Sequence, residues 1–203
     1  MTERNFDYAE QIGRTGEFVV AYHLRSLERM VCHHGGEGEQ KFEGRKLITS
    51  LGNVILPDLS WFKMVGHKQQ FFWADVKTKT YCTFNRHAGE WQTGCGLSAL
   101  DQYRLVSAAT QKLCFIFFLQ LRSDSPEGRC PTGLFFASTA KLFCSKRAHF
   151  WRSNGMIYWD TAILDRAAGI EDLLRVPKCR HYLKKLYLII GFDDRLPPEN
   201  FDQ

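Results

Sequence analysis

The spacing of apolar residues along the first part of the chain predicts one long helix followed by β-structure. Apolar side chains recur at three- and four-residue steps over 7–30, as on one face of a helix. Residues 47–65 alternate in places and predict two strands, or one bent strand, with the break at Pro57. The β-prone run 71–77 predicts a further strand, and 78–96 is expected to be irregular, with room for a short hairpin.

A second helix and further strands are predicted in the rest of the chain. Ser98 is a candidate N-cap for a helix that runs to about Thr110. The nearly continuous apolar run 113–121 is typical of a strand that is covered on both faces. Shorter elements are predicted as strands at 133–138, 156–164 and 186–191 and as a helical turn at 169–174.

This order of elements predicts one α/β domain over 1–203, built on a central mixed β-sheet flanked by helices. The 203 residues suffice for one sizeable core and are few for two. The chemically informative motifs lie within about 5–121. Residues 122–203 are expected to complete the sheet and to supply basic surface.

The charge of the chain is mildly basic and unevenly distributed. A formal net charge of +5 permits a polyanionic partner without requiring one. The segments 141–152 and 175–185 could hold a nucleic-acid backbone, or each could be an ordinary solvated helix face. Their candidate contact residues are Lys146, Arg147, Arg152, Lys178, Arg180, Lys184 and Lys185.

The cysteines and the apolar runs bear on the location of the protein. Seven cysteines, an odd number without C-x-x-C spacing, favour reduced thiols and a cytoplasmic protein over a secreted disulfide scaffold. The polar N-terminus does not resemble a signal peptide, and the run 113–119 is too short to span a bilayer. The spacing of cysteine and histidine at 32–34 and at 82–95 fits no common structural zinc site.

The most informative chemistry is an Asp–x–Lys motif on the strand 71–77. Asp75 and Lys77 are two positions apart and therefore point to the same face of the strand, and Asp58 could lie alongside on the neighbouring strand. Two carboxylates are hard oxygen ligands suited to Mg²⁺, with the carbonyl of Val76 as a further ligand. Lys77 would orient or deprotonate a water, or neutralise developing charge. The alternative is a surface ion pair at a strand end, with Asp58 capping a turn.

At Pro57-Asp58 and Asp75-Val76-Lys77 the sequence resembles the PD-(D/E)XK nuclease superfamily. The resemblance implies a restriction-endonuclease-like fold and often an acidic residue in the first helix. The Gly16-Glu17 pair looks like the Gly-Glu helix of members similar to Holliday-junction resolvases, which makes Glu17 a metal-shell carboxylate. Such members often carry a glutamine on the following helix, and Gln102 is the candidate. The RecB-type Gln-x-x-x-Tyr pattern is absent.

The resemblance implies a Mg²⁺-dependent endonuclease that hydrolyses phosphodiester bonds in DNA, with Mn²⁺ expected to substitute. Selectivity for DNA structure is one interpretation. The alternatives are a sequence-specific restriction-type nuclease and a catalytically inactive nucleic-acid-binding module of the same fold. Lys79, on the face of Lys77, either contacts a phosphate or is a solvated strand-end lysine. With one active site per subunit, cutting both strands would favour a two-fold homodimer.

Overall fold

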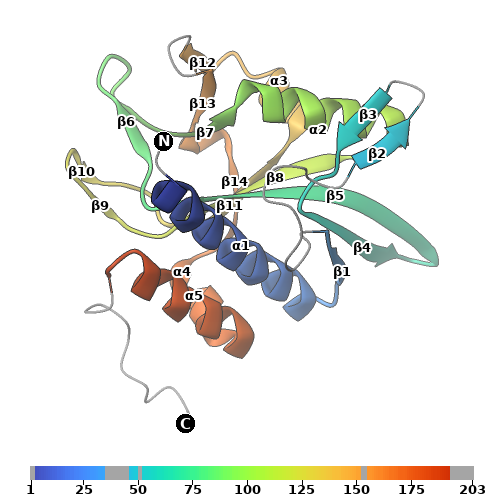
Figure 1. Ribbon diagram of the computed structural model, residues 1–203, viewed down its shortest axis with the longest axis horizontal. Helices are drawn as coiled ribbons and strands as arrows, with labels where there is room; N and C mark the ends of the chain where they lie inside the picture. The colour runs from blue at the N-terminus through green and yellow to red at the C-terminus, as the bar shows by residue number, and fades with distance from the viewer. Residues whose placement is uncertain (1–2, 35–45, 50–51, 152–154, 193–203) are drawn as a thin grey trace.

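A six-stranded mixed sheet forms the centre of this computed structural model, which describes residues 3–34, 46–49, 52–151 and 155–192. In the sheet order β1–β4–β5–β8–β11–β14, the β5–β8 pair is parallel and the other pairs are antiparallel (Figure 1). These strands are β1 (Met30–His33), β4 (Leu59–Val65), β5 (Lys68–Lys79), β8 (Cys114–Gln120), β11 (Gly133–Ser138) and β14 (Asp165–Ala168). The predicted central mixed sheet is confirmed.

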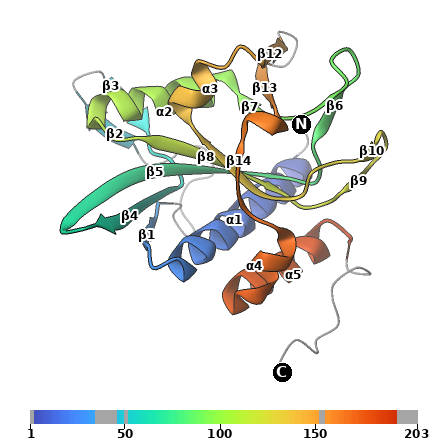
Figure 2. The same cartoon turned by 180° about the vertical axis from the view of Figure 1, so that it is seen from behind.

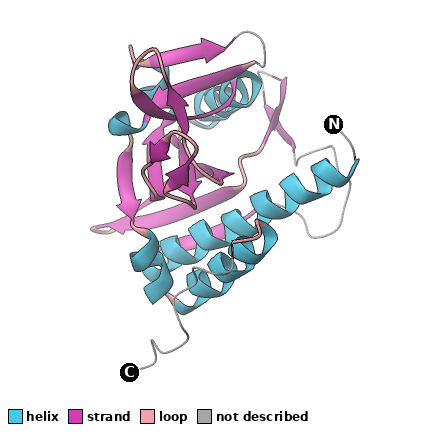
Figure 3. Cartoon of the chain, turned by 90° about the vertical axis from the view of Figure 1, so that its left-hand side faces the viewer, coloured by secondary structure: helices cyan, strands magenta, loops and turns pink. Residues whose placement is uncertain are grey.

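Helices cover both faces of this sheet (Figures 2 and 3). Helices α1 (Glu3–Ser26), α4 (Ile170–Arg175) and α5 (Pro177–Ile189) pack on one face, and α2 (Leu97–Thr110) and α3 (Thr139–Phe143) on the other. Successive residues of β5 face alternate cores, because side chains along a strand alternate between its two faces. Ala74 and Val76 join the core under α1, whereas Trp73 joins the core under α2. Among the described helices, none is both long and apolar enough to cross a membrane.

Smaller sheets surround the central sheet. A four-stranded sheet has the order β12–β13–β7–β6, and two hairpins, β2–β3 and β9–β10, stand apart from it (Figure 1). Their bounds are β2 (Lys46–Thr49), β3 (Gly52–Ile55), β6 (Thr83–Asn85), β7 (Glu90–Gly96), β9 (Asp124–Ser125), β10 (Gly128–Arg129), β12 (Ala148–Trp151) and β13 (Met156–Asp160). A 3₁₀ turn at Thr161–Ile163 follows β13. The hairpin allowed for in 78–96 is therefore present as β6–β7.

Two helix boundaries differ from the sequence prediction. The first helix ends at Ser26 rather than Met30, because the chain turns through Glu28, whose φ of 59° lies in the left-handed region, and Met30 then starts β1. Ser98 is not the cap of α2. That helix begins at Leu97, and its N-cap is Gly96, which makes no side-chain hydrogen bond.

The predicted last strand at 186–191 is wrong, because most of that segment belongs to α5. Cys179, Leu183, Leu186 and Tyr187 are all buried, and their spacing of three and four residues places them on one face of a helix. They pack with residues of α1 in the core between α1 and the sheet. A short apolar run that ends a longer helical pattern is easily mistaken for a strand, because periodicity cannot separate the two over so few residues.

Candidate active site

Asp58 lies just beyond the end of an antiparallel ladder and binds a backbone N–H of β5. Strand β4 pairs with β5 only up to Leu59, which lies opposite Ala74, so the described β4 ladder stops just before Asp75. Beyond that point, Asp58 Oδ2 accepts a 2.8 Å hydrogen bond from the Val76 N–H. The N–H and the carbonyl of one strand residue point to the same side, so the carbonyl of Val76 faces this open edge too.

Asp75 and Lys77 form an ion pair on the α2 side of β5. Lys77 Nζ lies 2.7 Å from Asp75 Oδ2, and it donates a second hydrogen bond of 3.0 Å to the hydroxyl of Tyr103 on α2. Asp75 is 2% exposed and Tyr103 is also buried, whereas Lys77 is partly open to solvent. The lysine is thus fixed by a carboxylate from its own strand and a phenol from the covering helix.

A close helix–strand contact brings Glu17 towards this group from the opposite face. Any Cβ at Gly16 would overlap Thr78 Oγ1, so only glycine lets α1 cross β5 at this distance. Glu17, the next residue, is nearly buried with 12% of its side chain exposed. Its charge is close enough to Asp58 to raise the pKa of that carboxyl. The Gly-Glu pair of the sequence therefore has a physical reason in the packing of α1.

The charges of the site act on one another strongly. The pKa of Asp58 is well above its ordinary range, first because of burial and then because of the negative charges of Asp75 and Glu17. Burial alone would lower the pKa of Lys77, but Asp75, Tyr103 and Asp58 outweigh burial and raise that pKa well above its ordinary value. Asp75 and Asp58 thus act on the ammonium of Lys77, and Glu17 acts on Asp58.

Two buried carboxylate oxygens of this group are incompletely hydrogen-bonded. Within the described part of the chain, Asp75 Oδ2 and Glu17 Oε2 have no well-aligned hydrogen bond, although each has a nitrogen close by. Lys77 Nζ is 2.7 Å from the first and His33 Nε2 is 2.8 Å from the second. Oxygens that are buried, charged and incompletely hydrogen-bonded are suited to a hard cation.

The donor set fits Mg²⁺ better than a metal that needs a closed cage. No three histidine, cysteine, aspartate or glutamate side chains converge into a ready-made metal site among the residues described here. Mg²⁺ usually keeps several waters and takes only one or two protein carboxylates together with substrate phosphate. Asp58 and Asp75, with the carbonyl of Val76 at the same edge, provide such a sparse set. Glu17 adds charge beside them.

Of the two remaining candidate residues, Lys79 lies on the face of Lys77 and Gln102 is turned away from the site. Lys79 shares the face of Lys77 and has no ion-pair partner in the described part of the chain. Burial and the charge of Lys77 lower the pKa of Lys79. Gln102, in contrast, is turned towards the β2–β3 hairpin, where its Oε1 accepts a 3.2 Å hydrogen bond from the Ile55 N–H. A direct catalytic role for Gln102 stays a prediction.

The two basic segments lie on opposite sides of the central sheet (Figures 1 and 2). In the first, Lys146 is exposed, and Arg147 pairs with the buried Asp160 at 2.7 Å. Arg152 lies outside the described residues. In the second segment, on α5, Lys178 and Lys185 are exposed and Arg180 and Lys184 are half-buried. The described parts of the two segments therefore lie on different sides of the sheet.

Two residues at the site are not marked as part of it by the sequence. Tyr103 reads as one more apolar position of its helix, and no pattern identifies its hydroxyl as a partner of Lys77. His33 ends β1, opposite Leu59, and contacts Glu17. The adjacent pair His33-His34 is the available signal, although nothing in its spacing points to Glu17, 16 positions earlier.

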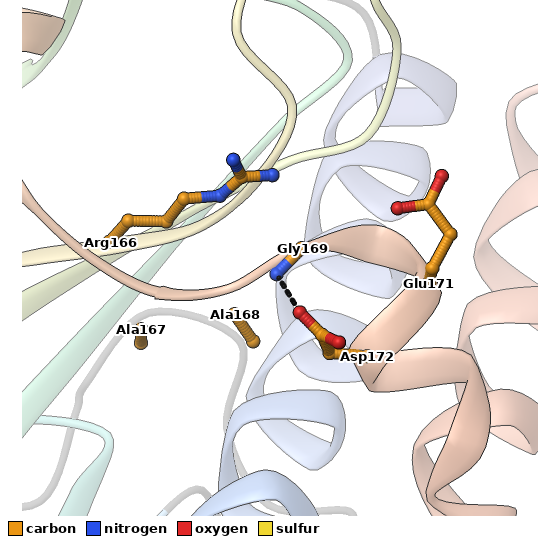
Figure 4. A pocket seen from close by; sticks show the side chains of 6 residues that line it. All are labelled: Arg166, Ala167, Ala168, Gly169, Glu171 and Asp172. Atoms are coloured by element: carbon orange, nitrogen blue, oxygen red, sulfur yellow. Dashed lines mark hydrogen bonds between the residues drawn. The ribbon is translucent and has the colours of Figure 1, made fainter.

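A separate pocket lies at the start of α4 (Figure 4). It has a volume of about 430 Å³ and is lined by Arg166, Ala167, Ala168, Gly169, Glu171 and Asp172. Asp172 Oδ2 already accepts a 2.9 Å hydrogen bond from the Gly169 N–H. None of the lining residues belongs to the Asp58–Asp75–Lys77 group.

Comparison with known proteins gives structural similarity without sequence similarity. No family model matches the sequence, and no curated protein matches it. One similar solved structure is Hjc, a Holliday junction resolvase of Archaeoglobus fulgidus, with a TM-score of 0.44, 10% identity and coverage of 74% of this chain and 90% of that chain. Another is D212, a nuclease from a fusselovirus, with a TM-score of 0.39, 11% identity and coverage of 90% and 94%. This chain is thus similar in structure to a Holliday junction resolvase and to a viral nuclease.

Proposed function

We propose that this protein is a Mg²⁺-dependent endonuclease that hydrolyses phosphodiester bonds in DNA, and that Mn²⁺ can replace Mg²⁺. The observation that carries the proposal is the Asp75–Lys77 ion pair of 2.7 Å beside Asp58, at the point where the β4 ladder ends. Burying a carboxylate and an ammonium costs desolvation free energy, and such groups therefore cluster at functional sites. The proposal rests on the site, because a fold by itself does not imply an activity.

Each residue of the site has a chemical task in this proposal. Asp58, Asp75 and the Val76 carbonyl would hold the metal, with Glu17 beside them; when bound, Mg²⁺ lowers the pKa of a water and stabilises charge at the phosphorus. Lys77 stays an ammonium at neutral pH, because its pKa is raised. It is therefore suited to orienting the attacking water and neutralising developing charge rather than to removing a proton.

The substrate would be held by cations outside this group. Lys79 reaches the same face two residues further along β5 and has no carboxylate partner among the described residues, so it is available for a substrate phosphate. The lysines of α5 and the segment 141–152 offer further backbone contacts, and the salt dependence of binding would reveal their number. A second subunit related by a two-fold axis would allow both strands of a duplex to be cut.

Cleavage of three DNA substrates tests this proposal. Supercoiled plasmid, linear duplex and a four-way junction are incubated with the wild type and with Lys77→Met, in Mg²⁺, Mn²⁺ or chelator. We expect metal-dependent cleavage by the wild type and little by the variant. Discrete fragments from the linear duplex would favour a sequence-specific nuclease. Binding to all three substrates without cleavage in either metal would instead support an inactive binding module.

A further inference from the structure

The end of β1 touches two of the proposed metal-binding positions through consecutive residues. His33 Nε2 lies 2.8 Å from Glu17 Oε2. The backbone N–H of His34 donates a 2.7 Å hydrogen bond to the carbonyl of Asp58. The reaction proposed above uses neither histidine. The His34 contact is part of the strand geometry, whereas the His33 contact is made by a side chain and depends on the residue type.

The imidazole of His33 is held in place by the neighbour of the residue that it contacts. Its ring stacks on Phe18 with centroids 5.0 Å apart and planes 6° apart. Phe18 in turn stacks on Tyr182 of α5, at 4.7 Å and 15°. Two successive residues of α1 therefore contact one imidazole: Phe18 stacks on the ring face, and Glu17 lies beside a ring nitrogen.

Glu17 needs such a partner because of its surroundings. Its carboxylate is 12% exposed and interacts repulsively with Asp58 across the site. A glutamate has several rotatable bonds and would turn its charge away from a second carboxylate unless a donor held it there. His33, with 19% of its side chain exposed, is placed to be that donor.

We propose that His33 is a positioning residue of the metal site: it holds the Glu17 carboxylate towards Asp58 and thereby sets the affinity for the divalent cation. The inference rests on the function proposed above and adds a residue to it. His33 does not touch the reacting atoms in this arrangement. Partners that hydrogen-bond a metal-binding side chain typically change metal affinity or activity by about 10–100-fold when removed.

Mn²⁺ binding to the protein, measured by calorimetry without DNA, tests the proposal. We expect His33→Ala to weaken Mn²⁺ binding by about 10–100-fold. His33→Gln, whose amide nitrogen can reach the place of Nε2, should recover part of the affinity. His67→Ala is the matched control, because His67 is exposed at the β4–β5 turn and should leave Mn²⁺ binding unchanged.

A double-mutant cycle separates positioning from a general loss of structure. In a Glu17→Gln background, His33→Ala should cause no further loss of Mn²⁺ affinity, because the carboxylate that it positions is gone. Phe18→Leu, which removes the stack but keeps the imidazole, should weaken binding by less than His33→Ala. Phe18→Leu also serves as the test should His33→Ala not fold.

The ways in which the proposal can fail are distinguishable. Wild-type affinity in folded His33→Ala or, failing that, in Phe18→Leu would overturn the positioning role while leaving the proposed function intact. Equal losses from His33→Ala with and without Glu17 would overturn it too. If the wild type does not bind Mn²⁺, or Asp75→Asn and Glu17→Gln bind it as the wild type does, the metal site and the function built on it are wrong.

Discussion

Gly16 of α1 lies against Thr78 of β5 so closely that no side chain fits between them. Gly16 and Thr78 both belong to regular elements, and their contact fixes where the helix crosses the strand. Glu17, the next residue, is carried to the site by this crossing. The position of the Glu17 carboxylate thus depends on Gly16 having no side chain.

Gly16→Ala should therefore destabilise the protein and weaken metal binding together. Forcing a methyl group into a filled contact typically costs about 1–3 kcal/mol, and here the helix must shift to admit it. Gly13→Ala is the control, since a Cβ at Gly13 meets nothing within 4 Å. That variant should be neutral or stabilised by up to about 1 kcal/mol, because alanine is the better helix former. Urea unfolding and Mn²⁺ titration on both variants measure the difference, and equal effects would contradict the packing argument.

Asp58→Asn should abolish metal-dependent cleavage. It should nevertheless stabilise the folded protein at pH values above 3.8, the ordinary pKa of this carboxyl. Burial and two neighbouring carboxylates raise the pKa of Asp58, so the folded protein binds its proton more tightly than the unfolded chain does. Wild-type stability then falls as the pH rises from the unfolded towards the folded pKa, and the asparagine variant lacks this loss. Unfolding free energies measured across that pH range test the sign.

The matched control for that variant is Asp165→Asn, because Asp165 is exposed and pairs with Lys141 away from the site. It should change neither cleavage nor the pH dependence. Retention of near-wild-type turnover by Asp58→Asn would remove Asp58 from the metal-binding set.

Much of the order of the elements can be predicted from the sequence, because α1, β5 and α2 have a clear apolar period, whereas β1 is not predicted as a strand. The apolar pattern predicts the buried part of β5 and nearly all of α2. The joining of distant segments cannot be predicted. Nothing local marks β1 as the edge strand beside β4, or Tyr103 as the partner of Lys77, because both depend on contacts between residues 26 or more positions apart. The end of α5 is predicted wrongly for the opposite reason, since its last apolar turn is too short to show a period.

Lys77→Met should slow the chemical step by about 10²–10⁴-fold without weakening Mn²⁺ binding. The lysine competes with the cation for the charge of Asp75, so metal affinity should be unchanged or improved. Lys68→Met is the control on the same strand, because Lys68 is exposed at the far end of β5. Single-turnover cleavage at saturating metal separates the two quantities. Should Lys77→Met lose metal binding and show no defect once metal saturates, Lys77 would be structural.

Tyr103→Phe should lower the cleavage rate modestly, by about three- to tenfold, the worth of one hydrogen bond. Its hydroxyl accepts a 3.0 Å hydrogen bond from Lys77 and also interacts with Asp75. In a Lys77→Met background the phenylalanine should have no further effect on the rate. A full additional loss in that double variant would mean that Tyr103 acts on the substrate directly. Tyr8→Phe, at an exposed position of α1, is the control.

The salt dependence of DNA binding should identify which side of the sheet holds the backbone. Replacing Lys178, Arg180, Lys184 and Lys185 by glutamine should reduce the slope of log affinity against log salt by about one for each phosphate that the protein no longer binds. Replacing Lys146 and Arg147 tests the other side in the same way. An unchanged slope in one set shows a solvated face there, and unchanged slopes in both would leave the binding surface to residues nearer Lys79.

The alternation of side chains along β5 limits how this site can change in evolution. Asp75 and Lys77 face the α2 core, while Val76 between them faces the α1 core. Inserting or deleting one residue in the strand before Asp75 would exchange the two faces, bury the charges under α1 and turn an apolar side chain towards Tyr103. A two-residue change would keep the facing and move the charges along the sheet by one repeat. Length variants of this strand that keep the chemistry should therefore differ by even numbers of residues.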